Sequence, residues 1–112
     1  MVLYANNKRN NGRTKREIMV GVKTGTEMKQ VYTIDLSHAG VKVGAANLQL
    51  PLGAQVELIL EKGGEKIPFS GRIARQDGLC YINRIGRDAN AFFIKILDNR
   101  FSEFLKINYQ VV

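Results

Sequence analysis

Short runs of alternating apolar and polar residues are the feature that most constrains the fold of this chain. Val56, Leu58 and Leu60 share one side of an extended segment, and a second alternating run spans residues 67–74. The dipeptide at 63–64, Gly-Gly, lies between them and suits a tight hairpin turn. The pattern therefore predicts an antiparallel hairpin with one buried face.

Further strand-like runs occur along the chain, separated by turn signals. They lie at residues 18–24, 31–36, 41–43, 79–85 and 91–97. We expect turns between them, including one at 75–78, "RQDG". Several short strands at this spacing predict a mainly β domain, a small antiparallel barrel or sandwich.

In the last segment of the chain, the spacing of apolar residues changes from that of a strand to that of a helix. Phe101, Phe104 and Leu105 are spaced as on one face of a helix, and Asp98 or Asn99 can cap its start. We expect a short amphipathic helix that covers one open end of the β structure.

Charge and composition restrict the class of protein. The 112 residues predict one domain, and the net charge of +7 favours an anionic partner. Five cations fall within residues 8–16, so we divide the chain into a flexible basic arm, 1–16, and a folded domain, 17–112. No apolar run reaches the roughly 18–20 residues of a membrane span, and no secretory signal precedes the arm, so we expect a cytoplasmic protein.

The sequence gives little support for catalysis or metal binding. The chain has one cysteine and one histidine, too few for a zinc cluster or a convincing Cys/His catalytic pair. It also lacks a nucleophile elbow, a phosphate-binding P-loop and a zinc-protease motif. We therefore predict a protein that is not an enzyme and has no metal or cofactor.

The stretch "TIDLSHAG" ends a strand in residues that strands disfavour. Alternation predicts that Ile34 and Leu36 are buried and that Asp35 and Ser37 point outward. Gly40 permits a positive φ and leaves no side chain in the way. The stretch is then either a turn capped by Asp35 and Ser37 or a small outward platform of hydrogen-bond acceptors.

Two arginines upstream indicate which kind of ligand the platform could bind. Arg9 and Arg13 carry planar guanidinium groups, which bind phosphate, bond the O6/N7 edge of guanine and stack on purines. The opposite edge of guanine carries donors, which suit the carboxylate of Asp35. If the two segments meet in space, they form a sensible site for a guanine nucleotide.

These motifs resemble the signature of the PilZ domains, bacterial receptors for cyclic di-GMP. The family has R-x-x-x-R in an N-terminal arm and then [D/N]-x-S-x-x-G. This chain has Arg9 to Arg13, 21 residues, and then Asp35 to Gly40. The resemblance implies a six-stranded antiparallel β-barrel followed by a short C-terminal helix.

The resemblance also implies roles for individual residues. Arg9 and Arg13 clamp guanine and phosphate, Asp35 and Ser37 bond the guanine edge, and Gly40 lets the chain turn close to the ligand. Ligand binding then orders the arm, and a downstream protein partner reads the changed surface.

Several cations and one histidine near the motif have less defined roles. The resemblance implies that Lys8 contacts a second, stacked ligand molecule. Lys15 and Arg16 form a competing cationic pair, and His38, at a variable motif position, is expected to be an exposed loop residue.

Two other functions compete with a cyclic di-GMP receptor. The positive charge also suits a small barrel that binds single-stranded nucleic acid, although the aromatic residues fall mostly at core positions. The second alternative is a PilZ-like module that binds only protein. We expect a monomer or a weak dimer.

Overall fold

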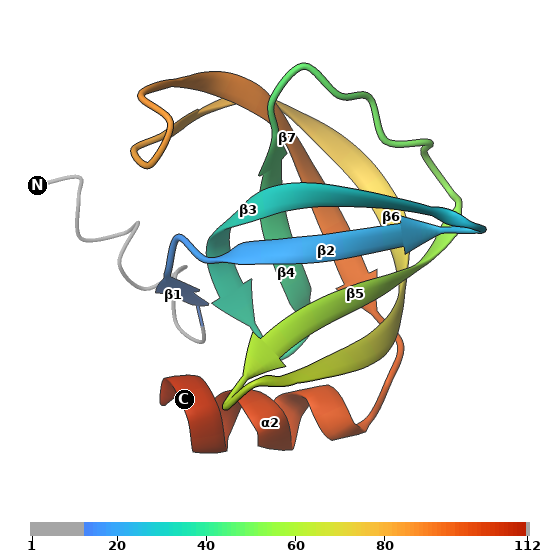
Figure 1. Ribbon diagram of the computed structural model, residues 1–112, viewed down its shortest axis with the longest axis vertical. Helices are drawn as coiled ribbons and strands as arrows, with labels where there is room; N and C mark the ends of the chain where they lie inside the picture. Colours follow the sequence, from blue (N-terminus) through green and yellow to red (C-terminus); the bar gives the residue numbers. More distant parts are fainter. Residues whose placement is uncertain (1–12, 112) are drawn as a thin grey trace, which may run out of the picture.

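The computed structural model describes residues 13–111, and its main feature is one antiparallel sheet that curls round on itself (Figure 1). The strands are β1 (Arg13–Lys15), β2 (Met19–Thr24), β3 (Glu27–Ser37), β4 (Gly40–Ala45), β5 (Gln55–Lys62), β6 (Glu65–Ile82) and β7 (Arg87–Ile96). One helix, α2 (Arg100–Tyr109), follows them.

The sheet closes into a ring. Its order is β1-β3-β2-β5-β6-β7-β4, and β3 also pairs with β4, so six strands from β3 to β4 form a closed circuit. Strand β1 lies outside this circuit and, among the described strands, pairs with the end of β3 alone. The predicted mainly β fold, with six antiparallel strands and a short C-terminal helix, is confirmed.

One predicted turn is absent. The segment 75–78, expected to separate two strands, lies inside the 18-residue strand β6. Register shifts between Ile73 and Arg75 and between Gln76 and Leu79 bend the strand, and Gly78 takes a φ of 72° there. The glycine is used for an irregularity within the strand and not for a reversal of the chain.

Helix α2 lies across one end of the ring (Figure 1). Phe101, Leu105 and Tyr109 recur every four residues and pack into the core between the strands. The ring of Phe101 meets that of Phe69 edge-on, with 5.1 Å between their centroids. The predicted helix and its position over an open end are therefore found.

Asp98 supplies the side-chain cap of this helix. Its Oδ1 accepts hydrogen bonds from the Arg100 backbone N–H and from Arg100 Nε, both at 3.0 Å, whereas Asn99 makes no side-chain cap bond. These bonds to Arg100 hold the pKa of the Asp98 carboxyl below its usual value. Within residues 13–111, no helix is long and apolar enough to cross a membrane.

The described structure includes only the last four residues of the predicted arm, 1–16, because it begins at residue 13. Residues 1–12, which include Lys8 and Arg9, lie outside the described residues. The flexibility predicted for this segment therefore stays a prediction. Arg13–Lys15 form β1 on the edge of the sheet. Residues 13–15 of the predicted arm therefore belong to the sheet.

Candidate functional site

A β-bulge in β3 changes which residues of the "TIDLSHAG" stretch face the core. The pairing of β3 with β4 shifts between Thr33 and Asp35, which inserts one extra residue into β3. Thr33 and Leu36 are fully buried, while Ile34 is only half-buried. The predicted burial of Leu36 is confirmed, but that of Ile34 is wrong, because the bulge restarts the alternation.

Ser37 does not project freely from the sheet. It is buried, and its Oγ donates to the Gly40 carbonyl at 2.9 Å and accepts from the Gly40 N–H at 3.3 Å. The prediction that Ser37 points outward to a ligand is therefore wrong for the described conformation. For this residue, the alternative of a capped turn is the one observed.

Gly40 is required for close packing and not for a positive φ. It is absent from the described glycines with left-handed φ, which corrects the prediction. A Cβ atom here would lie 2.3 Å from the Ile94 carbonyl oxygen and 2.7 Å from Cζ of Phe93. Glycine therefore lets the start of β4 approach β7.

Strand β1 brings the two halves of the sequence motif together. Arg13 is directly opposite Ser37 in the pairing of β1 with β3, and Lys15 is directly opposite Asp35. The predicted residues Arg13, Asp35, Ser37 and Gly40 therefore occupy adjoining parts of the sheet. Arg9 and Lys8 lie outside the described residues.

Asp35 lies between two lysines. Its partner on β1 is Lys15, and its partner on β4 is Lys42, so one carboxylate is flanked by a cation on each neighbouring strand. Asp35 and Lys42 are half-buried, which lowers solvent screening of their charges. Lys42 was not identified from the sequence, although it is the single charged residue of β4 and stands two positions after Gly40.

Arg16, the other cation considered beside Lys15, is held by the helix. Its Nη2 donates to the Tyr109 carbonyl at 3.1 Å, at the end of α2 where the helix dipole favours a cation. The Arg16 N–H also bonds the Ile34 carbonyl at 3.2 Å. Arg16 thus joins the base of the arm to α2.

Four further hydrogen bonds hold the segment that follows β1. The hydroxyl of buried Thr33 donates to the Arg16 carbonyl and accepts from the Ile18 N–H at 2.9 Å. Glu17 accepts from the backbone N–H groups of Asn83, at 2.7 Å, and Arg84, at 2.9 Å. The exit of the arm is therefore bound to β3 and to the β6–β7 turn.

His38 is half-buried and not an exposed loop residue as predicted. Its Nδ1 lies 2.7 Å from Oγ of Ser102 on α2. The helix covers this part of the β3–β4 connection, which the sequence pattern did not reveal. The motif and α2 are therefore in direct contact.

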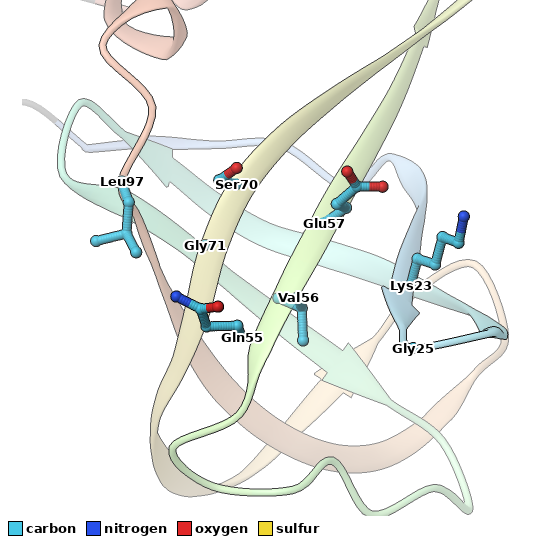
Figure 2. Close-up of a pocket in the computed structure, with 8 residues that line it drawn as sticks. All are labelled: Lys23, Gly25, Gln55, Val56, Glu57, Ser70, Gly71 and Leu97. Atoms are coloured by element: carbon cyan, nitrogen blue, oxygen red, sulfur yellow. The ribbon is translucent and has the colours of Figure 1, made fainter.

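Two surface hollows lie on different parts of the ring. One, of about 340 Å³, borders the motif and is lined by Lys15, Arg16, Glu17, Ile34, Tyr81 and Asn83. The other, of about 390 Å³, is lined by residues of β2, β5 and β6 and by Leu97 (Figure 2). Asp35, Ser37 and Gly40 line neither hollow. The first hollow nevertheless adjoins Asp35 through Lys15, its partner on β1, and Ile34, its neighbour in the chain, so we place the candidate site beside the first hollow.

Cys80, the single cysteine, has no reactive environment. It is half-buried, and burial raises the pKa of its thiol above the usual value. A raised pKa disfavours the thiolate, the nucleophilic form.

Comparison with known proteins identifies the class of domain. A sequence profile described as the PilZ domain matches residues 7–87. The PilZ domain of CeSA from a cellulose-synthesizing bacterium superposes with a TM-score of 0.59 and 23% identity, over 88% of this chain and 95% of that one. The Bacillus subtilis inhibitor of motility, MotI/DgrA, has a TM-score of 0.57 and 16% identity, over 88% of this chain and 48% of its own. No curated protein sequence matches.

Proposed function

Because the chain belongs to the PilZ domain family, we propose that it is a receptor for cyclic di-GMP. The observation that carries the proposal is the pairing of β1 with β3, which sets Arg13 opposite Ser37 and Lys15 opposite Asp35. Two motif segments separated by 21 residues in the sequence therefore adjoin on one edge of the sheet.

The chemistry of the site suits a dianionic guanine dinucleotide. The Asp35 carboxylate accepts from the N1 and N2 donors of guanine, while Arg9 and Arg13 bond the opposite guanine edge or a phosphate. Lys15 and Lys42 on either side of Asp35 offset the charge of the phosphates. Lys8 is proposed to contact a second, stacked ligand molecule.

Ligand binding is proposed to order the basic N-terminal segment over the sheet. Ordering exchanges chain entropy for charge-assisted bonds and stacking. The segment leads into Arg16, whose guanidinium bonds the last turn of α2, and His38 of the motif contacts Ser102 on the same helix. We therefore propose that ligand binding changes the surface around α2 and that a protein partner in the cytoplasm binds this surface. No catalytic step is involved.

The proposal is tested by calorimetric titration of the protein with cyclic di-GMP. Micromolar or tighter binding is expected for the wild type, with loss of binding in Arg13→Ala and Asp35→Ala. Lys23→Ala, at the second hollow (Figure 2), removes one cation away from the motif and is the matched control. The proposal is contradicted if the folded wild-type protein shows no heat of binding at about 100 µM ligand.

A PilZ-like module without a ligand is the second candidate, because Ser37 is already engaged by the Gly40 backbone. In that case the motif serves only as a turn, and titration with cyclic di-GMP gives no binding. A nucleic-acid platform has less support. Such platforms combine several exposed aromatic side chains, and Tyr81 is the one strongly exposed aromatic residue within residues 14–111.

A further inference from the structure

The two lysines and the carboxylate of the candidate site belong to a longer row of side chains. Lys15 is opposite Asp35, Asp35 is opposite Lys42, Lys42 is opposite Phe93, and Phe93 is opposite Arg75. Directly opposed residues in a sheet share a face. We call these five residues, which cross β1, β3, β4, β7 and β6, the outer row.

Phe93 shows that the row lies outside the core. Its neighbours Phe92 and Ile94 belong to the core cluster, whereas Phe93 does not, although it is only 9% exposed. Its ring packs against Gly40, where a Cβ atom would lie 2.7 Å from the Phe93 Cζ. The motif glycine thus gives space to an aromatic ring on the ligand side of the sheet.

Arg75 ends the row with a guanidinium in a fixed orientation. Its Cζ lies 4.6 Å from the centroid of the Phe93 ring, and its Nε donates to Asp77 Oδ1 at 2.9 Å. The side chain is nevertheless 53% exposed, and within the described part of the chain its two terminal nitrogens make no hydrogen bond. A planar cation therefore faces solvent with its donors available.

We propose that the ligand site extends along the outer row and that Arg75 stacks on, or bonds, the second guanine of the dinucleotide, with Lys42 beneath the phosphates. The inference rests on the proposed function. Three strand spacings of about 4.8 Å separate Asp35 on β3 from Arg75 on β6. A ligand with guanines on opposite sides of its ribose–phosphate ring can contact both residues, whereas a single guanine held at Asp35 cannot.

The experiment measures the dissociation constant of cyclic di-GMP by calorimetry for four variants and the wild type. Arg75→Ala removes the cation, and Arg75→Lys keeps the charge but removes the planar group. Arg72→Ala is the matched control, because Arg72 is an exposed arginine on the same strand and lies opposite Lys95, outside the row. Asp35→Ala reports whether the ligand uses the motif at all.

We expect Arg75→Ala to weaken binding about tenfold, as for the loss of one stacking or cation–π contact to a base. Arg75→Lys should lose most of that affinity, and Arg72→Ala should stay within about twofold of the wild type. If Asp35→Ala abolishes binding but Arg75→Ala behaves like Arg72→Ala, the extension is wrong and the receptor function stands. If the wild type does not bind, both are overturned.

Lys42→Ala keeps the inference testable if loss of Arg75 exposes Phe93 and unfolds the protein. This variant is expected to weaken cyclic di-GMP binding at low ionic strength more than at high, because it removes a phosphate partner. An affinity equal to that of the wild type at both ionic strengths would remove Lys42 from the site and contradict the proposed row.

Discussion

The hydroxyl of Thr33 is predicted to hold the base of the N-terminal segment on the sheet. It is fully buried, donates to the Arg16 carbonyl and accepts from the Ile18 N–H. Thr33→Val keeps the shape of the side chain but leaves both backbone groups without this partner. Thr33→Ser keeps the hydroxyl and removes only a methyl group.

The magnitude follows from these two bonds. Each backbone group left unsatisfied costs about 1–3 kcal/mol, and the lower end applies near the surface, so Thr33→Val should lose about 2 kcal/mol of unfolding free energy. Thr33→Ser should lose about 1 kcal/mol, the cost of a buried methyl group. With an m-value of about 2 kcal/mol per M urea, the valine variant unfolds at about 1 M less urea than the wild type.

Urea unfolding followed by circular dichroism measures the stability, and amide hydrogen exchange at Ile18 reports the bond itself. Protection of the Ile18 amide should fall in Thr33→Val and persist in Thr33→Ser. A valine variant as stable as the wild type, with an equally protected Ile18 amide, would refute the reasoning.

Two other substitutions test how the motif and the helix are built. Gly40→Ala places a Cβ against the Ile94 carbonyl and the Phe93 ring, so thermal unfolding should show a loss of about 1–3 kcal/mol, and unchanged stability would contradict the close packing. Asp98→Ala should cost about 1 kcal/mol through loss of the cap, measured by urea unfolding at pH 7. Because Arg100 lowers the pKa of Asp98 from 3.8, the stabilisation is present above that pH and is lost as the pH falls through the lowered value. The difference between wild type and Asp98→Asn should therefore shrink at pH 3, and a constant difference would argue against the charge.

The β hairpins could be predicted from the sequence because their signals are local. The glycines at 63 and 64 take φ values of 62° and 83° between two alternating runs, as a tight turn requires. The same logic failed at 75–78, where Gly78 serves a bulge within β6. Local sequence does not distinguish a glycine that reverses the chain from one that bends a strand.

The candidate site could be predicted only in part, because it depends on strand register. The motif spacing identified Arg13, Asp35 and Gly40, but the pairing that sets Lys42 beside Asp35 involves two strands whose alignment includes a bulge. The burial of Ser37 similarly depends on how the β3–β4 connection folds back on Gly40. Such contacts follow from the closed ring and have no signal within a short window of sequence.

Cyclic di-GMP is proposed to bind at the edge formed by β1, β3 and β4. Backbone amide chemical shifts of the labelled protein, recorded during titration with cyclic di-GMP, test it most directly. The largest changes are predicted at Asp35, Ser37 and Lys42, with little change at Glu57 and Ser70, which line the other hollow (Figure 2). Changes centred on Glu57 and Ser70, or none at saturating ligand, would contradict the account.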